Sequence, residues 1–315
     1  MFFIHIPKTA GTSFRKSAEQ YFSSSYIAYD YSLNSSETSA LIKEIIYKRN
    51  DILLLSERLK ESEIKFLSGH VPASKYIHIS GSRNTITFLR DPVQRIVSEY
   101  YHFVRHNNYT GSLKSFYENP NFVNRQKKIL QGVPIRTIGY IGITEKYTDS
   151  LDGINRHFGL DLPNLELNVG RDKKSKTYTL DEKTASEIIE LNKEDIQLYK
   201  NASKLFLERK SIEEKGFSYV HGDIQQVNDK SVSGWAYYSN SNDPVLVTIL
   251  KNNNIIGQVN ATDLRPGFLS VSPPRNGYIG FRFKFNTPCK PGEKISCIIS
   301  SSGQVLGSHQ IDKAS

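Results

Sequence analysis

Two patterns of hydrophobic and polar positions divide the chain of 315 residues near Gly216. Before this point, short apolar runs alternate with segments whose apolar residues recur at helical spacing. After it, the helical spacing disappears and short runs of alternating apolar and polar residues replace it. Since these periods are typical of helices and of half-buried strands, we expect an α/β domain over 1–215 and an all-β domain over 219–315.

The first domain is expected to alternate strands with helices. The predicted strands cover 2–6, 65–67 and 85–89, with a short strand or loop over 52–55 and a strand-then-helix segment over 140–151. The predicted helices cover 12–23, 38–48, 56–62, the stretch after Asp91, 111–118, 122–132, 147–158 and 180–209. Strands joined by helical crossovers form a parallel sheet with helices on both faces. The predicted fold class is therefore a P-loop-like three-layer α/β sandwich, which binds ligands at the carboxyl ends of its strands.

The second domain is expected to be a small β-sandwich. Five alternating runs predict its strands, at Ser231–Tyr238, Val245–Leu250, Ile255–Val259, Ile279–Phe285 and Ile295–Ser300. Stretches rich in Asn, Gly, Pro and Ser separate these runs, and such stretches form tight turns. The spacing of short strands and turns is typical of sandwiches and barrels.

The overall charge favours anionic ligands. The chain carries 41 Lys and Arg residues against 32 Asp and Glu residues, a net charge of +9. A surplus of this sign attracts anions. The basic residues are scattered along the chain and no known nucleic-acid module occurs, so nucleic acid is not an expected partner.

No leader or membrane span is expected. The first residues lack a charged segment followed by an apolar one, and no apolar run has the length of a transmembrane helix. This indicates either a cytoplasmic protein, which is the favoured interpretation, or a chain from which a leader has been removed. The two cysteines, Cys289 and Cys297, are expected to be free buried thiols, as is usual in a reducing compartment.

Residues 2–14, FFIHIPKTAGTSF, predict a strand, a loop of small residues and the start of a helix. Small side chains let backbone amides approach an anion, and the helix N-terminus adds partial positive charge. The loop residues are expected to hold a phosphate group through Lys8, Thr9, Ala10, Gly11, Thr12 and Ser13. A Walker A loop places its lysine after the glycines, whereas Lys8 precedes Gly11. This order argues against hydrolysis of a nucleoside triphosphate.

A second polar site follows the strand predicted over 85–89. Arg90 ends this strand, and Asp91 with Pro92 is expected to cap and begin a helix. Ser98 lies about two turns into that helix. Arg90 and Ser98 are candidate ligands for a second phosphate; the alternative is an arginine paired with Asp91 and a solvated serine.

His70 is the candidate general base. It lies in the segment Leu67–Pro72, between Gly69 and a proline, and is expected on a loop. Its ordinary pKa of about 6.5 suits proton transfer near neutral pH. His5 is expected to be a core residue within the first strand. His102 and His106 share a helix face, but no third ligand accompanies them, so a metal site is not expected.

These motifs resemble the carbohydrate sulfotransferases that use 3′-phosphoadenosine 5′-phosphosulfate (PAPS), especially heparan sulfate 2-O-sulfotransferase and its bacterial relatives. The resemblance covers about the first 210 residues. It implies that the loop grips the 5′ side of the donor, with Lys8 stabilising the leaving oxygen. It also implies that Arg90 and Ser98 bind the 3′-phosphate and that His70 deprotonates an acceptor hydroxyl.

Three further segments resemble parts of such proteins. In Asn124–Gly132 the basic and amide residues are rearranged relative to the family, which leaves the roles of Arg125 and Gln126 open. The basic loop Asn168–Lys176 resembles one that closes over the donor, so it adds the candidate contacts Arg171, Lys173 and Lys174. The final domain resembles bacterial β-sandwich appendices. Its Trp235 could stack on a sugar, although a core position is the expected one.

The implied function is transfer of a sulfuryl group from PAPS to a hydroxyl, that of a saccharide being favoured, without a metal. Two alternatives stay open. A P-loop kinase would share the fold but needs magnesium ligands. A carbohydrate-binding protein without catalysis would act through the β domain.

Overall fold

The computed structural model describes residues 1–165 and 177–312 and divides the chain into two compact units. The first unit comprises Met1–Ser80, Asn84–Val133 and Tyr140–Phe206. The second unit comprises Leu207–Ser315 together with two short earlier segments, Gly81–Arg83 and Pro134–Gly139. Each unit has its own sheet structure and is described separately.

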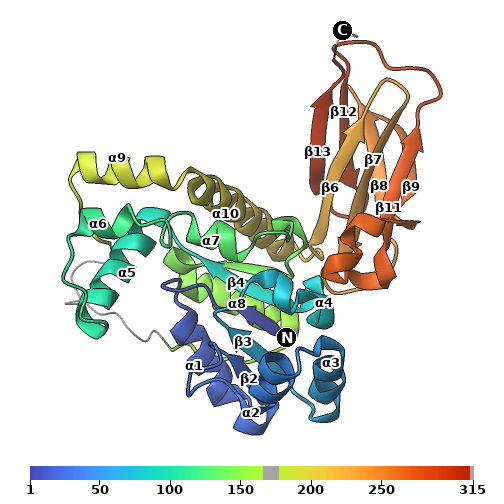
Figure 1. Ribbon diagram of the computed structural model, residues 1–315. Helices are drawn as coiled ribbons and strands as arrows, with labels where there is room; N and C mark the ends of the chain where they lie inside the picture. The colour runs from blue at the N-terminus through green and yellow to red at the C-terminus, as the bar shows by residue number, and fades with distance from the viewer. Residues whose placement is uncertain (166–176, 313–315) are drawn as a thin grey trace. The chain divides into compact units, whose positions relative to one another are not determined.

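The first unit is built on a parallel sheet of five strands (Figure 1). The strands are β1 (Phe2–Ile4), β2 (Ile27–Asp30), β3 (Phe66–Gly69), β4 (Thr85–Leu89) and β5 (Tyr140–Ile143), in the order β2-β3-β1-β4-β5. After β1, the chain adds β2 and β3 on one side of β1, and it then crosses over to add β4 and β5 on the other side. The carboxyl ends of β1 and β4 therefore flank the kind of crevice in which α/β sheets bind ligands. This arrangement confirms the predicted fold class.

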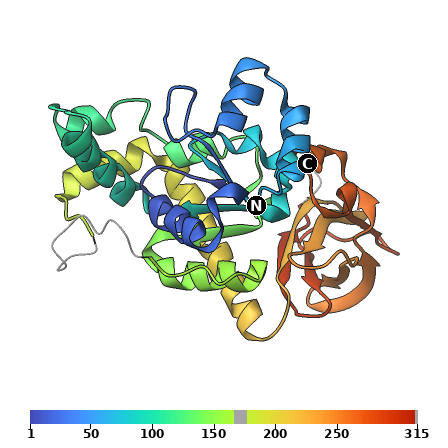
Figure 2. The same cartoon turned by 90° about the horizontal axis from the view of Figure 1, so that it is seen from below.

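Helices cover both faces of the sheet (Figures 1 and 2). The helices of this unit are α1 (Gly11–Tyr21), α2 (Ala40–Ile42), α3 (Ile52–Glu61), α4 (Ile77–Ser80), α5 (Pro92–His106), α6 (Leu113–Tyr117), α7 (Arg125–Ile129), α8 (Tyr147–Phe158), α9 (Glu182–Leu191) and α10 (Lys193–Glu214), whose last turns belong to the second unit. Phe88 of β4 contacts Phe14 of α1 and Tyr147 of α8, with ring centroids 5.3 and 5.5 Å apart. The two helices thus pack on the same face of the sheet.

Most local predictions for this unit are confirmed, and four are corrected. The first strand ends at Ile4, so His5 lies just beyond it. The segment 52–55 is helical because Asp51 caps α3 by accepting a hydrogen bond from the Leu54 amide at 2.9 Å. Strand β2 was not predicted. The long helix predicted over 180–209 is two helices that meet at the buried Asn192.

The second unit is a sandwich of two antiparallel sheets, as predicted. One sheet has the order β10-β11-β7-β6 and the other the order β13-β12-β8-β9. The strands are β6 (Val220–Val227), β7 (Ser231–Tyr238), β8 (Leu246–Lys251), β9 (Asn254–Asn260), β10 (Asp263–Leu264), β11 (Tyr278–Lys284), β12 (Lys294–Ile299) and β13 (Val305–Gln310). Of these, β6, β10 and β13 were not predicted. Cys289 and Cys297 are free and buried in its core.

Trp235 is buried on the face of β7 that points away from the hydrophobic core between the two sheets. It is 2% exposed and packs against Phe268 and Tyr237, with ring centroids 4.9 and 5.6 Å apart. A ring enclosed in this way cannot stack on a sugar, so Trp235 is a buried residue as expected, although it lies outside the core between the sheets.

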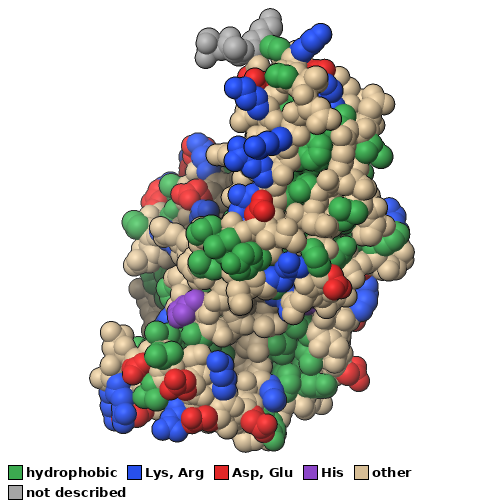
Figure 3. All heavy atoms as spheres, turned by 90° about the vertical axis from the view of Figure 1, so that its right-hand side faces the viewer, with side chains coloured by type: hydrophobic (Ala, Val, Ile, Leu, Met, Phe, Trp, Pro, Cys, Tyr) green, Lys and Arg blue, Asp and Glu red, His purple; other side chains and the backbone are tan. Residues whose placement is uncertain are grey.

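Charged side chains are dispersed on the surface. On the face shown in Figure 3, Lys and Arg side chains occur in several separate places among uncharged ones. Within the part of the chain that the structure describes, no helix combines the length and apolar character needed to cross a bilayer.

Candidate active site

A cavity of about 1440 Å³ lies at the carboxyl ends of the strands of the first unit. Its lining comes from the loop after β1, the residues after β3 and β4, α5, Arg125, the segment from Thr144 into the start of α8, and Thr177 with Tyr178. Among the described residues, this lining holds five Lys or Arg side chains and three carboxylates. The cavity exceeds the roughly 300–1,000 Å³ of a typical small-molecule site. It therefore has room for two ligands and favours anionic ones.

The loop between β1 and α1 contains two residues in the left-handed backbone conformation. Lys8 has a φ of 67° and Ala10 a φ of 63°. For residues other than glycine, sparsely populated backbone conformations cost roughly 1–3 kcal/mol each and concentrate at ligand sites. Gly11 begins α1, and the first amides of a helix have no carbonyl partner within it. The loop thus leads into a helix N-terminus suited to an anion.

One side chain of the loop stabilises the loop itself, and the others line the cavity. Thr9 is fully buried, and its hydroxyl donates to the Ile6 carbonyl oxygen at 2.9 Å. Its side chain therefore stabilises the loop and does not line the cavity. The other five predicted loop residues do line it: Lys8, Ala10, Gly11, Thr12 and Ser13.

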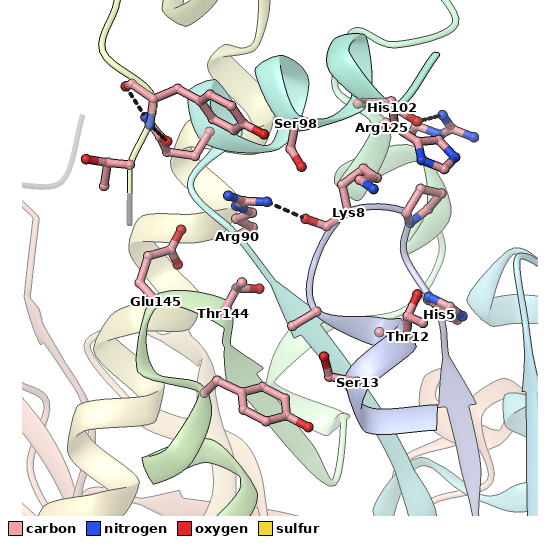
Figure 4. Close-up of a pocket in the computed structure, with 18 of the residues that line it drawn as sticks. His5, Lys8, Thr12, Ser13, Arg90, Ser98, His102, Arg125, Thr144 and Glu145 are labelled. Carbon is pink, nitrogen blue, oxygen red and sulfur yellow. Dashed lines mark hydrogen bonds and ion pairs between the residues drawn. The ribbon is translucent and has the colours of Figure 1, made fainter. Parts of the chain in front are cut away.

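Lys8 and Arg90 approach each other over the cavity, with Ser98 on the neighbouring helix (Figure 4). The Arg90 guanidinium donates from Nη1 to the Lys8 carbonyl oxygen at 3.1 Å. Burial lowers the pKa of the Lys8 ammonium, which has no hydrogen-bond or ion-pair partner among the described residues. Two cations and the Ser98 hydroxyl thus face the same space.

Gln126 holds the main chain of Arg90 on both sides. Its side-chain oxygen accepts from the Arg90 amide, and its Nε2 donates to the Arg90 carbonyl oxygen, each at 3.0 Å. Gln126 is fully buried. On the other side, the Asp91 carboxylate caps α5 by accepting from the Gln94 amide at 2.9 Å, and Pro92 begins the helix as predicted. The role that the sequence left open for Gln126 is therefore to position Arg90.

Arg125 brings positive charge to the cavity wall. It forms an ion pair with Glu99, whose other carboxylate oxygen lies 2.5 Å from Nη1 of the fully buried Arg95. One carboxylate thus serves two guanidinium groups. Because Arg95 does not reach the cavity, the surplus positive charge faces the cavity through Arg125.

The main chain of β2 places His70. His70 directly follows β3, and its amide donates to the Asp30 carbonyl oxygen at 3.1 Å. A Cβ on Gly69 would lie 2.1 Å from that same oxygen, so only glycine permits this approach. The buried Asp30 carboxylate accepts three bonds of 2.6 Å, from Tyr47, Lys75 and Tyr76.

The imidazole of His70 is neutral at physiological pH. The side chain is exposed to the solvent of the cavity, and partial desolvation by the surrounding protein lowers its pKa to about 4. Arg125 and Arg15 add to this effect through their positive charge. Among the described residues no hydrogen bond engages its side-chain nitrogens, so a lone pair is available to accept a proton.

His5 is buried, as expected of a core residue, but it also lines the cavity. Its Nδ1 lies 2.8 Å from the Tyr31 hydroxyl, and its ring centroid is 4.4 Å from that of His70. The sequence reasoning missed this position. The available signal was that His5 and His70 each follow a parallel strand at its carboxyl end.

The second half of α5 adds ring nitrogens to the lining. His102 and His106 have ring centroids 4.8 Å apart and both line the cavity. In the described ranges, no group of three or more His, Cys, Asp or Glu residues is arranged to hold a metal ion.

Other predicted segments have a supporting role or cannot be placed. The side chain of Gln94 holds the main chain of Tyr178 against α5. Its Nε2 donates to the Tyr178 carbonyl oxygen at 3.0 Å, and its Oε1 accepts from the Tyr178 amide at 2.6 Å. Glu145 accepts from the Asp91 amide at 3.0 Å and from the Tyr199 hydroxyl at 2.9 Å, which makes it a scaffold residue. The candidate contacts Arg171, Lys173 and Lys174 lie outside the described residues.

Comparison with known proteins finds similarity to sulfotransferases. A crystal structure of a sulfotransferase from Alicyclobacillus acidocaldarius aligns with 15% sequence identity and a TM-score of 0.36, covering 64% of this chain and 94% of that chain. No curated protein sequence matches this chain. The sequence profile described as "Sulfotransferase family" matches residues 1–132. This match, which includes the loop, His70, Arg90 and Ser98, supports a relation of the N-terminal 132 residues to the sulfotransferase family.

Proposed function

We propose that this protein is a sulfotransferase that moves a sulfuryl group from PAPS to a hydroxyl group of a carbohydrate. The observation that carries the proposal is the convergence of three sites, far apart in the sequence, on one cavity. The loop residues Lys8 and Ala10–Ser13, the pair Arg90 and Ser98, and His70 all line it. The family match of residues 1–132 supports the class of reaction.

The donor fits the charges of this cavity. The backbone amides at the start of α1 would hold its 5′-phosphate, while Arg90 and Ser98 would hold its 3′-phosphate. These assignments suit the chemistry, because guanidinium groups and helix N-termini both bind phosphate. The space beyond the volume of one typical ligand leaves room for the acceptor next to His70.

The proposed reaction is an in-line displacement at sulfur. His70 takes the acceptor proton, and the Lys8 ammonium stabilises the oxygen that leaves with adenosine 3′,5′-bisphosphate. Like phosphoryl transfer, this chemistry depends mainly on positioning and on stabilisation of charge. The negative charge of a bound donor would offset the nearby arginines and raise the pKa of His70, which would make it a stronger base. The proposed mechanism uses no metal.

The remaining assignments follow from this reaction. We assign transfer to the domain over 1–215 and an accessory role to the β domain over 219–315. Because the donor is made in the cytosol, we propose a cytoplasmic enzyme whose partner is a saccharide and not a nucleic acid.

The direct test is transfer of label from sulfur-labelled PAPS to a panel of neutral and acidic oligosaccharides, compared with simple alcohols. Labelled saccharide is expected, with equal yield in EDTA and in magnesium. In parallel, calorimetry is expected to show that adenosine 3′,5′-bisphosphate binds the full chain. Turnover of ATP that requires magnesium would instead favour a kinase. Saccharide binding without transfer would favour a carbohydrate-binding protein.

A further inference from the structure

His5 and His70 occupy equivalent positions on neighbouring parallel strands. β1 pairs with β3 so that Ile4 lies opposite Gly69, and the His5 amide continues the ladder by donating to the Gly69 carbonyl oxygen at 3.0 Å. Each histidine is thus the first residue beyond its strand. Side chains at the same register of adjacent strands point to the same side. The two rings accordingly lie 4.4 Å apart between centroids.

The Nε2 edge of His5 lies against the N-terminus of α1. A Cβ on Gly11, the first residue of this helix, would be 2.3 Å from Nε2 of His5 and 2.1 Å from its Cδ2. His5 is only 6% exposed and lines the cavity beside Thr12 (Figure 4). Among the described residues, Nε2 has no hydrogen-bond partner. An unpartnered nitrogen of a largely buried ring, open to the cavity, therefore adjoins the first turn of an eleven-residue helix.

Tyr31 determines which nitrogen of His5 carries the proton. Burial raises the pKa of the Tyr31 phenol and lowers the pKa of His5 well below its ordinary value, so the phenol is protonated and the imidazole is neutral. The phenol oxygen lies 2.8 Å from Nδ1 of His5 and 3.4 Å from Oγ of Ser68. A phenol that donates its proton to the nearer acceptor, Nδ1, leaves that nitrogen unprotonated. The single N–H group of the neutral imidazole is in that case at Nε2.

We propose that His5 donates a hydrogen bond from Nε2 to an oxygen of the sulfuryl group during transfer, and that Tyr31 positions this donor. The inference rests on the proposed function. It deepens that function because the sulfur must lie between the 5′-phosphate at the start of α1 and the hydroxyl beside His70. His5 adjoins both.

In this step the bond between sulfur and the 5′-phosphate oxygen breaks while the acceptor oxygen forms a new bond to sulfur. The acceptor proton passes to His70, and the electron pair of the broken bond leaves with adenosine 3′,5′-bisphosphate. His5 keeps its proton throughout. A fixed donor that holds the charged oxygens of the reacting group in place through the transition state is a recognised source of rate enhancement.

The first test is independent of turnover. Full-length protein labelled with nitrogen-15 in its histidines is examined by NMR, and the His5 signals are assigned by their loss in His5→Gln. The proposal expects a neutral ring protonated at Nε2, with an Nε2 signal that shifts when inorganic sulfate is added. Protonation at Nδ1, or a signal that sulfate leaves unchanged, would overturn the proposal.

The second test separates the sulfuryl group from the nucleotide. His5→Ala is expected to lower kcat by about 10²–10³-fold and to change the affinity for adenosine 3′,5′-bisphosphate by less than about twofold, since that product lacks the sulfuryl group. His5→Gln retains an N–H donor and is expected to recover part of the lost rate. Tyr31→Phe should cost about 10-fold or more, as loss of an orienting partner does. His309→Gln, which changes an exposed histidine of the sandwich, is the control.

The outcomes distinguish the inference from the function on which it rests. If the wild-type protein transfers label but His5→Ala does so at the same rate, the inference fails and the proposed function stands. If the wild-type protein neither transfers label nor binds the bisphosphate, the proposed function fails. The NMR result then decides whether His5 donates to a bound sulfate ion.

Discussion

The two units of this protein each bury a histidine, and the two sites differ in what surrounds the ring. In the first unit, His5 pairs with Tyr31 through Nδ1, while its Nε2 adjoins a helix N-terminus and a cavity. In the second unit, Nδ1 of His221 in β6 lies 2.8 Å from the carbonyl oxygen of Arg136. Its Nε2 is enclosed and has no hydrogen-bond partner among the described residues. One ring can meet a ligand, and the other cannot.

This difference extends to the backbone. In the first unit, polar residues follow the strands at one edge of the sheet, and the loop there holds Lys8 and Ala10 in costly conformations. In the second unit, His221 is buried and stacked on Tyr237, with ring centroids 5.0 Å apart. Burial of a titratable group therefore indicates a functional site only where the group also faces a cavity. The predictions below test this distinction from the largest expected effect to the smallest.

The largest effect is expected for His70→Ala. Loss of the general base should reduce transfer by about 10²–10⁴-fold, while the affinity for adenosine 3′,5′-bisphosphate stays nearly unchanged because His70 does not hold the nucleotide. Rates from labelled donor and calorimetric titration measure the two quantities. Turnover equal to that of the wild-type protein would remove His70 from the mechanism.

Arg90→Ala should weaken binding of adenosine 3′,5′-bisphosphate by about 1.5–3 kcal/mol, the usual loss for a hydrogen bond to a charged group. Arg90 also supports the loop through the Lys8 carbonyl, so a second ligand is needed to separate the two roles. Binding of adenosine 5′-phosphate, which lacks the 3′-phosphate, should be much less affected. An equal loss for both nucleotides would show that Arg90 acts only on the loop.

The matched control for Arg90→Ala is Arg275→Ala in the second unit. Arg275 also donates to a carbonyl oxygen, that of Asn242, at 3.0 Å. If nucleotide chemistry is confined to the first unit, this change should leave both affinities as they are in the wild-type protein.

The parts of the site that were predictable from sequence are those whose cause is local. The turn at Asp91 and Pro92, the loop around Gly11 and the position of His70 beyond a strand each depend on residues adjacent in the chain. The fold class was also predictable, because it follows from the alternation of two hydrophobic periods.

The partners of these residues were not predictable. Asp30, whose carbonyl accepts from the His70 amide, lies in β2, a strand of four residues that shows no clear period. Gln126 bonds the main chain of a residue 36 positions away, and such contacts arise only when the sheet assembles. His5 appeared to be a core residue because an apolar run surrounds it, and only the register with β3 places it beside His70.

Gly11→Ala is expected to act through His5. The added Cβ would lie 2.1 Å from the ring, so the ring or the loop must move. Overpacking of this kind costs about 1–3 kcal/mol, and nucleotide binding should weaken with stability because the loop is part of the site. In the double variant with His5→Ala the collision is absent, so the two changes should be less than additive. Denaturant unfolding measures this, and full additivity would mean that the two residues do not interact.

The smallest effect, and the one confined to the second unit, concerns His221. Burial, with a further contribution from Arg209, lowers its pKa to about 3, against an ordinary value of 6.5. Below pH 6.5 the unfolded chain binds a proton at this site and the folded chain does not, so the unit loses stability as the pH falls from about 6.5 toward 3. His221→Phe keeps an aromatic ring beside Tyr237 but cannot take up a proton. Between pH 7 and pH 5, the variant should therefore lose about 2 kcal/mol less stability than the wild-type protein.

Trp235, the single tryptophan of the chain, is buried in the same unit, so its fluorescence reports on the unfolding of this unit. His309→Phe, at an exposed position of the same unit, provides the comparison. Transfer at pH 7 should be equal in all three proteins, because neither histidine faces the cavity. An unchanged pH dependence in His221→Phe would mean that His221 takes up its proton in the folded state, and the contrast drawn between the two buried histidines would then be wrong.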